Sequence, residues 1–288
     1  MKIAVVGATG VLGQNLVPLL IKHGYEVLAL VRSINKAKKV LPPRIEIAEY
    51  DLLAPDKKNK LTELLKDSDC VIHIATSIPS DFNKPGAWDV NNRLRTQGTR
   101  KLIEASIEVG VKRYIQQSIV MAYRDGGEEW INEEHPLDES PDRELICGPV
   151  VEMENLVKKI PENKMDWFIL RGGIFVGPGT FQEKTMHDLK KGLKIVTGSC
   201  ENFVSFVHVA DMADAILKSI ENEEVNLILN IVDQPVKQIE YLQELSQKIE
   251  TISPLQNKKL PTPPSFRCSN LRARYTINWK PNHNIYPY

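Results

Sequence analysis

The chain has 288 residues, of which 42% are hydrophobic and 26% are charged, a composition that is ordinary for globular proteins and excludes global disorder. Its 37 Lys and Arg residues balance 37 Asp and Glu residues, so the net charge gives no electrostatic basis for binding nucleic acid or an anionic membrane. Because the four cysteines and six histidines are widely spaced, we expect reduced thiols, a cytoplasmic protein and no bound metal.

The first predicted elements are a short apolar strand, Lys2–Val6, and a helix, Val11–His23, whose leucines fall on one face. Residues 3–21 carry no charge, which is close to the length of a membrane span. The stretch nevertheless contains three glycines and Pro18, and its apolar opening is too short for the core of a signal peptide. We therefore expect a strand, a tight turn and a helix rather than a membrane segment.

Strand-like and helix-like segments alternate as far as residue 172. Further strands are predicted at Glu26–Val31, Arg44–Tyr50, Cys70–Thr76, Lys112–Ser118 and Trp167–Leu170, and helices at Leu61–Lys66, Trp88–Val109 and Pro149–Ile160. Residues 124–148 show no helical or strand period and are expected to form a polar loop. The alternation predicts an α/β fold with a doubly wound parallel sheet and right-handed crossovers.

Beyond residue 172 the pattern is looser. Helices are predicted at Glu183–Lys191, Ala210–Glu221 and Gln238–Ile249, and strands at Asn202–Val209 and Asn226–Val232. We expect residues 1–171, joined again by 204–234, to form a dinucleotide-binding domain. Residues 172–203 and 235–288 are expected to form a smaller C-terminal substrate-binding lobe, with any small organic substrate bound between the two.

Three glycines at GxxGxxG spacing follow the first strand and open the first helix, in the sequence Gly7-Ala8-Thr9-Gly10-Val11-Leu12-Gly13. Glycines let the chain turn sharply and let the backbone approach a pyrophosphate, which is favoured by the free N–H groups at a helix start. The pattern alone is also compatible with a structural turn. The strand before it and the helix after it favour a dinucleotide-binding loop.

The end of the second predicted strand indicates which dinucleotide is bound. NAD-binding folds place an acidic residue there to bind the ribose hydroxyls, whereas this chain has Arg32. A guanidinium can bind a 2′-phosphate that a carboxylate would repel, and Lys36 and Lys38 add positive charge. We therefore predict NADP(H) over NAD(H); the alternative interpretation of Arg32 is a solvated surface arginine.

Taken in chain order, several segments resemble the extended short-chain dehydrogenase/reductase superfamily, in its branch of NAD-dependent epimerase/dehydratase-like proteins. They are the glycine loop, Tyr50-Asp51-Leu52, His73-Ile74-Ala75-Thr76, Val90-Asn91 with Gly98-Thr99, 170–179, 206–211 and 269–281. The resemblance covers nearly the whole chain and implies a Rossmann fold, with Asp51 at the adenine. The predicted cofactor site then comprises Gly7, Thr9, Gly10, Val11, Leu12, Gly13, Arg32, Asp51, Leu52, Ala75, Thr76 and Asn91.

The catalytic residues that this resemblance implies are missing. The superfamily uses Ser or Thr, a Tyr, and a Lys four residues after the Tyr, but none of the eight tyrosines here has a lysine at that spacing. Aligned with the family, Ile119 stands at the serine position, Ile146 at the tyrosine position and Val150 at the lysine position. Aliphatic side chains can neither transfer a proton nor bind a ribose.

Three other side chains near these positions are candidates for catalysis, namely Ser118, Tyr123 and Cys147. Each also has a structural interpretation, as a strand-end hydroxyl, a packed aromatic ring and a buried small hydrophobe. Two functions stay open: an NADP(H)-dependent oxidoreductase, epimerase or dehydratase with a nonstandard catalytic set, or a cofactor-binding sensor or regulator without turnover. The resemblance also implies a homodimer through the helices at 88–109 and 149–160.

Overall fold

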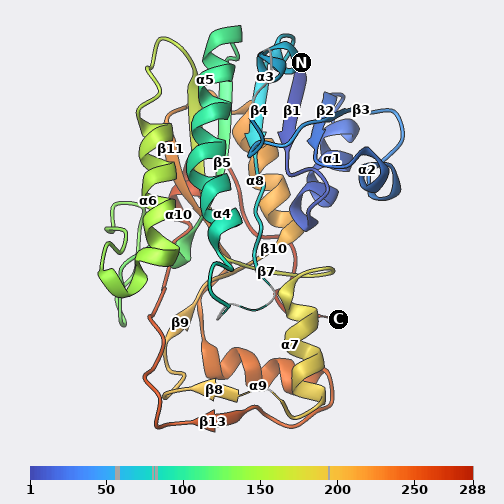
Figure 1. Cartoon of the computed structure of the whole chain (residues 1–288). Helices are drawn as coiled ribbons and strands as arrows, with labels where there is room; N and C mark the ends of the chain where they lie inside the picture. Colours follow the sequence, from blue (N-terminus) through green and yellow to red (C-terminus); the bar gives the residue numbers. More distant parts are fainter. Residues whose placement is uncertain (56–58, 80, 82–83, 194, 288) are drawn as a thin grey trace. The chain divides into compact units, whose positions relative to one another are not determined.

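The computed structural model describes residues 1–55, 59–79, 81, 84–193 and 195–287 (Figure 1). The described chain divides into two compact units. The first unit consists of Met1–Ser118, Asp138–Leu170 and Ala213–Ile228, and the second consists of Ile119–Leu137, Arg171–Met212 and Leu229–Tyr288. Within the described residues, no helix is long and apolar enough to cross a lipid bilayer.

In the part of the chain that the structure describes, the first unit is built on a seven-stranded sheet in the order β11-β6-β5-β4-β1-β2-β3. The strands are β1 (Lys2–Val6), β2 (Glu26–Val31), β3 (Glu46–Glu49), β4 (Cys70–His73), β5 (Arg113–Ile119), β6 (Asp166–Gly172) and β11 (Leu227–Ile231). The last residues of β5, β6 and β11 belong to the second unit. β1 pairs in parallel with β2 on one side and with β4 on the other. The predicted doubly wound α/β fold is therefore confirmed.

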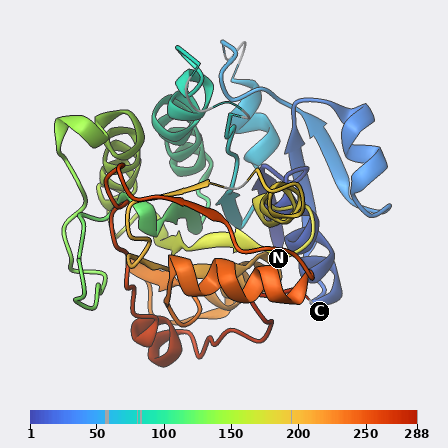
Figure 2. The same cartoon turned by 90° about the horizontal axis from the view of Figure 1, so that it is seen from below.

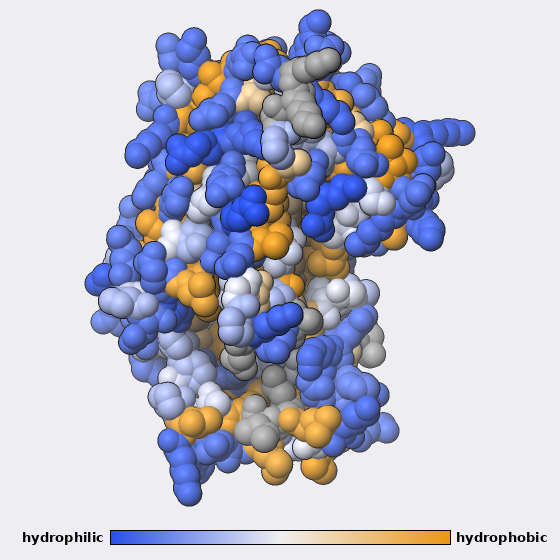
Figure 3. Space-filling view, in the orientation of Figure 1, coloured by the Kyte–Doolittle hydropathy of each residue, from blue (hydrophilic) through white to orange (hydrophobic). Residues whose placement is uncertain are grey.

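Both faces of this sheet are buried. Val6 of β1 packs in one apolar cluster with Leu102 of α5 (Thr99–Val109) and Val157 of α6 (Glu144–Lys158). Val5, whose side chain points to the opposite face, is also fully buried. Figure 1 shows α5 and α6 side by side on one face of the sheet, and their outer surfaces are mainly hydrophilic (Figure 3).

The other helices of the first unit include one α-helix that the sequence did not predict. They are α1 (Val11–Lys22), α2 (Ile34–Val40), α3 (Lys60–Leu65), α4 (Asp89–Arg93), the π-helical η1 (Leu94–Gly98), η3 (Pro141–Arg143) and most of α8 (Val209–Glu221). The unpredicted helix, α2, carries a capping signal, because Ser33 Oγ accepts the Lys36 N–H at 3.3 Å. The single helix predicted at 88–109 is interrupted by the π-helical turn η1, which separates α4 from α5.

Helix α6 begins at Glu144, so the predicted start at Pro149 was wrong, as was the irregular loop expected up to residue 148. Proline is favoured in a first turn, but it also fits inside a helix if the carbonyl four residues earlier finds another donor. Here that carbonyl belongs to Leu145, and it accepts a hydrogen bond of 3.1 Å from Asn92 Nδ2. Helix α4 therefore supplies the bond that Pro149 cannot make.

The second unit combines short strands with small helices. In its described part they are η2 (Val120–Ala122), β7 (Ile174–Val176), α7 (Phe181–Lys190), β8 (Ile195–Thr197), β9 (Phe203–Val204), β10 (Phe206–His208), β12 (Val236–Lys237), α9 (Gln238–Lys248), β13 (Leu255–Asn257) and α10 (Leu271–Thr276). Figure 2 views α7 along its axis and α9 from the side, so the two helices cross steeply. Leu189 of α7 and Leu245 of α9 pack in one apolar core.

Residues 119–137 belong to the second unit, whereas the sequence placed them in the dinucleotide-binding domain. Within that unit, Tyr123 forms a β-bridge with Leu137, and Ile131 forms one with Cys268. Ile131 and Cys268 also share an apolar cluster. These two residues are far apart in the sequence, so the local pattern from which the boundary was predicted carries no trace of their contact.

Candidate functional site

The glycine loop that joins β1 to α1 is a tight turn. Gly7 has a backbone φ of +101°, which L-residues with a side chain rarely adopt, and its carbonyl accepts the Gly10 N–H at 3.0 Å. A Cβ atom added at Gly7 would lie 2.6 Å from the backbone nitrogen of Ala75, which follows β4. Only glycine therefore fits here, and the loop is packed directly against the chain that leaves β4.

The start of α1 is open to a ligand. Gly10 is the N-cap residue and offers no side-chain cap, and no acidic residue lies in the first turn. The first N–H groups of the helix, from Val11 to Gly13, are therefore available to an anion. A Cβ added at Gly13 would lie 2.3 Å from the Ala8 carbonyl oxygen, whereas one at Gly10 would meet only the Gly7 oxygen, at 3.3 Å. The loop thus packs directly against the protein at Gly7 and Gly13 and leaves more room at Gly10. A pyrophosphate needs such room to approach the backbone closely.

On one side of β1, the strand ends carry two of the predicted cofactor residues. Arg32 directly follows β2, is exposed, and makes no ion pair with any residue that the structure describes. Asp51 is also exposed, and its Oδ1 accepts the Leu53 N–H at 2.9 Å. The turn after Asp51 is held by Lys101 of α5, whose Nζ donates to the carbonyl oxygens of Leu52 and Ala54 at 2.8 and 2.7 Å. No pattern in the sequence indicates this role of Lys101.

On the other side of β1, the predicted residue Asn91 has a supporting position. It is buried on α4, and its Oδ1 accepts the Ser77 N–H at 3.1 Å. It thereby fixes the segment after β4 that includes Ala75 and the exposed Thr76. The structure thus brings Gly7, Ala75 and Asn91 into one region at the carboxyl ends of β1 and β4.

A buried polar cluster lies behind this region, at the end of β4. His73 Nδ1 is 3.1 Å from Gln116 Oε1, 3.2 Å from Thr99 Oγ1 and 3.3 Å from the Tyr114 hydroxyl. Burial lowers the pKa of His73 to about 4, so its ring is neutral near pH 7. Its Nε2 atom is buried and has no hydrogen-bond partner among the described residues.

Two of the three catalytic candidates lie in the first unit, and both are engaged in hydrogen bonds within it. Ser118 is fully buried and its Oγ donates to Glu154 Oε1 at 2.7 Å. Cys147 is buried on α6, and its Sγ accepts from Arg143 Nη2 at 3.6 Å. Burial raises the pKa of the Cys147 thiol, so the neutral form predominates and its nucleophilicity is low.

The third candidate, Tyr123, lies in the second unit. Its side chain is fully buried, and its hydroxyl donates to Asn230 Oδ1 at 2.8 Å and accepts from Arg171 Nη1 at 2.7 Å. The Arg171 guanidinium also lies 4.7 Å from the centre of the tyrosine ring. Burial raises the pKa of Tyr123 well above its ordinary value, which disfavours proton transfer near pH 7. Catalytic roles for all three candidates stay predictions.

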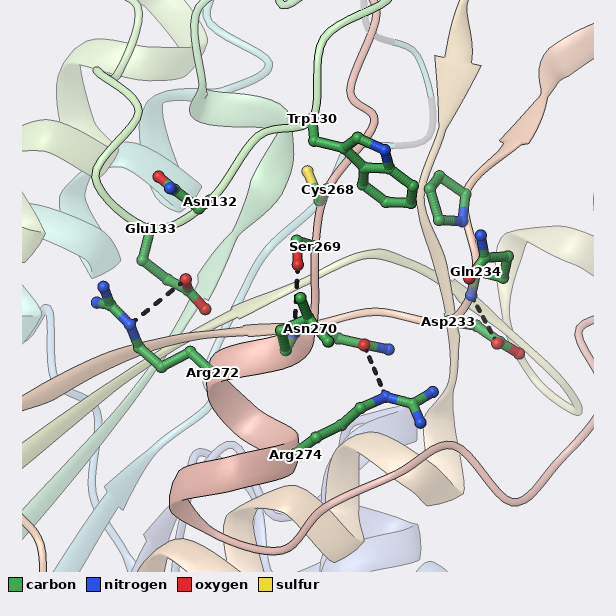
Figure 4. A pocket seen from close by; sticks show the side chains of 12 residues that line it. Trp130, Asn132, Glu133, Asp233, Gln234, Cys268, Ser269, Asn270, Arg272 and Arg274 are labelled. Carbon is green, nitrogen blue, oxygen red and sulfur yellow. Dashed lines mark hydrogen bonds and ion pairs between the residues drawn. The ribbon is translucent and has the colours of Figure 1, made fainter.

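The second unit also contains a polar hollow of about 750 Å³ (Figure 4). Trp130 stands at one rim, and Asp233 and Arg274 lie across from it. In its wall, buried Glu133 accepts the Asn230 N–H at 2.8 Å and lies 3.6 Å from the Arg272 Nε. Acidic and basic side chains thus balance around the hollow, and none of the predicted cofactor or catalytic residues lines it.

The sequence matches known proteins along its length. The model of the NAD dependent epimerase/dehydratase family matches residues 3–231. The 3-diazoavenalumate denitrifying reductase of a Streptomyces species is 28% identical over 309 residues, which cover 98% of this chain and 97% of that protein. The UDP-glucose 4-epimerase of Klebsiella pneumoniae is 32% identical over 133 residues, which cover 43% of this chain and 94% of that protein.

Solved structures show the same fold. The crystal structure of UDP-glucuronic acid 4-epimerase from Bacillus cereus in complex with NAD has a TM-score of 0.79 to this chain. The two are 19% identical, and the match covers 99% of this chain and 95% of the epimerase. At this identity the similarity concerns the fold alone.

Proposed function

Because the chain belongs to the NAD dependent epimerase/dehydratase family, within the extended short-chain dehydrogenase/reductase superfamily, we propose that it binds NADP(H) at the glycine loop. The observation that carries this proposal is the start of α1, which has no side-chain cap. Other backbone atoms pack tightly against Gly7 and Gly13 but leave more room at Gly10 for a ligand. When bound, the cofactor supplies a hydride. The N–H groups of the first turn of α1 hold its pyrophosphate, and Asp51 lies at the adenosine end.

The preference for NADP(H) rests on Arg32. The Bacillus cereus epimerase was solved with NAD, so the fold itself accepts the dinucleotide without a 2′-phosphate. In this chain the residue after β2 is an exposed arginine without an ion-pair partner among the described residues, and no acidic residue stands there to bind the ribose hydroxyls. A guanidinium at that point favours the phosphorylated ribose.

We propose reduction as the reaction, because the relative that aligns over nearly the whole chain is a reductase. Hydride transfer to a carbonyl leaves an alkoxide that needs a proton, and this chain has no Tyr-x-x-x-Lys set to supply it. A cationic acceptor, such as an iminium or diazonium ion, takes up hydride and needs no proton at the same step. We therefore propose a small organic substrate of this activated class.

A second function is favoured by one specific observation. The side chains of Ser118, Cys147 and Tyr123 are each held in hydrogen bonds within the protein. A protein that binds NADP(H) as a sensor or regulator needs no free catalytic group. The hydrogen bonds that engage these three side chains are therefore compatible with that function.

Calorimetry and a turnover screen distinguish the two functions. Purified protein is titrated with NADPH and NADH, and NADPH oxidation is then followed with neutral carbonyl, nucleotide-sugar and cationic acceptors. We expect micromolar or tighter NADPH binding and turnover with cationic acceptors. Tight binding without turnover of any acceptor supports the sensor, and the absence of binding by either dinucleotide refutes the proposal.

A further inference from the structure

Arg95 is a buried cation without an adequate partner. It lies in η1, with only 5% of its surface exposed. Its single hydrogen bond among the described residues runs from Nη1 to Met153 Sδ, at 3.8 Å. A guanidinium has five N–H donors and a thioether is a weak acceptor, so most of these donors have no partner among the described residues. Burial lowers the pKa of Arg95 to about 10, and the side chain remains charged near pH 7.

The acidic residue that offsets the charge of Arg95 is Glu154 of α6, and its carboxylate also interacts with other groups. Glu154 is fully buried and interacts favourably with the charge of Arg95. Its carboxylate also accepts the Ser118 hydroxyl at 2.7 Å and lies 3.7 Å from the Lys158 ammonium. Buried charges are normally paired and fully hydrogen-bonded, because an unpaired one is costly. The bonding capacity left over at Arg95 points to a ligand.

The position of Arg95 in the first unit indicates which ligand. The strand order places β2 and β3 on one side of β1, with Arg32 and Asp51 after them, and β4 and β5 on the other side. Asn91, one helical turn before Arg95, fixes the segment that follows β4. Arg95 bonds Met153 of α6, and the next residue, Glu154, accepts the hydroxyl of Ser118 near the end of β5.

Arg95 therefore lies at the carboxyl ends of β4 and β5, away from the adenosine side. A dinucleotide that crosses the glycine loop with its adenosine at β2 and β3 places its other half here. Helix α6 offers no buried cation in the described structure, because its buried residues are Cys147, Val150, Met153, Glu154 and Val157.

We propose that Arg95 binds the nicotinamide riboside half of the dinucleotide, through the oxygen atoms of its ribose or carboxamide. The proposal rests on the proposed function, since it requires that a nicotinamide dinucleotide is bound. Arg95 is then a cofactor-binding residue that fixes where the hydride is presented, and it supplies on η1 a buried positive charge, whereas the buried residues of α6 include no cation.

The test compares a whole dinucleotide with its adenosine end. Wild-type protein, Arg95→Met and Arg95→Lys are titrated calorimetrically with NADPH and with adenosine 2′,5′-bisphosphate. We expect Arg95→Met to weaken NADPH binding by about 10- to 100-fold, the range for losing a hydrogen bond to a charged group. Binding of the bisphosphate should stay within about twofold, and Arg95→Lys should recover part of the NADPH affinity.

The matched control is Arg93→Met, because Arg93 is an exposed arginine two residues earlier that bonds only Gln97, at 3.3 Å, among the described residues. It should change neither affinity. Equal loss of both ligands in Arg95→Met, or no loss of NADPH, overturns the proposal. If Arg95→Met does not fold, the comparison is made with Arg95→Lys, for which unchanged NADPH affinity overturns it. Wild-type protein that binds no dinucleotide refutes the proposed function itself.

Discussion

The proposed preference for NADP(H) over NAD(H) rests on Arg32, whose side chain is exposed directly after β2. We expect Arg32→Ala to weaken NADPH binding by about 10- to 100-fold, since a charge-assisted contact with the 2′-phosphate is lost. NADH, which lacks that phosphate, should bind with unchanged affinity. Calorimetric titration with both dinucleotides measures the difference, with Lys39→Ala as a control on the neighbouring helix α2. Equal losses for NADPH and NADH would refute the role of Arg32.

Substitution of Gly7 tests how closely the glycine loop packs against the chain that leaves β4. Gly7 and Gly24 both have positive φ angles, but only Gly7 has backbone atoms within 3 Å of an added Cβ; at Gly24 that space is open. Gly24→Ala should therefore lower the free energy of unfolding by about 1 kcal/mol, the backbone cost alone. Gly7→Ala adds overlap with Ala75 and should cost about 3 kcal/mol. Urea denaturation measures both, and equal costs would show that the close approach is absent.

The lowered pKa of His73 predicts that the free energy of unfolding depends on pH. Its folded pKa of about 4 lies below the ordinary value of 6.5, so the unfolded state binds more protons between these values. The stability from the neutral ring is fully present above pH 6.5 and is lost as the pH falls towards 4; at pH 5 the loss is about 2 kcal/mol.

Urea midpoints at pH 7 and pH 5 measure the contribution of His73. His73→Gln should show a smaller fall in stability between the two pH values than the wild type does. His187→Gln, at an exposed position, serves as the control and should retain the wild-type fall. If His73→Gln loses as much stability between pH 7 and pH 5 as the wild type does, the titrating group is not His73.

At the scale of elements, the bond between α4 and α6 explains how Pro149 is tolerated inside a helix. Asn92→Ala should lower the free energy of unfolding by about 0.5–1 kcal/mol, because the Leu145 carbonyl loses its donor. In a Pro149→Ala background the helix supplies its own N–H to that carbonyl, so the same substitution should cost less. Urea denaturation of the four proteins gives the coupling energy. A coupling of zero would mean that the Asn92 bond does not compensate for the proline.

The sequence predicted best those elements whose signals lie close together along the chain. The glycine loop lies between an apolar strand and an amphipathic helix, so spacing and periodicity within residues 1–23 sufficed. The start of α6 was missed because its compensating donor, Asn92, lies on another helix. The same reason hid Arg95 and the burial of His73, because both side chains are buried by strands and helices far away in the sequence. Lys101 was missed because its partners are backbone carbonyls, which leave no pattern in the sequence.

At the scale of the whole molecule, burial limits which surfaces of α5 and α6 are available for the predicted dimer contact. The apolar residues of α5 and α6, such as Leu102 and Val157, are buried in the core of the first unit. Those helices are therefore not free to offer apolar faces along their whole length. Among the large apolar side chains described for α4, α5 and α6, the exposed ones are Val90, Leu145 and Ile146, at the starts of α4 and α6.

We propose that the second copy docks on this patch, which the Asn92–Leu145 bond holds together. Light scattering after gel filtration at micromolar concentration should give a dimer for the wild type. Leu145→Glu combined with Ile146→Glu should give a monomer, because two charges would be buried in an apolar contact. Leu255→Glu, at an equally exposed leucine of the second unit, should leave the dimer intact. A monomeric wild type, or a dimer that survives the double substitution, removes this patch as the interface.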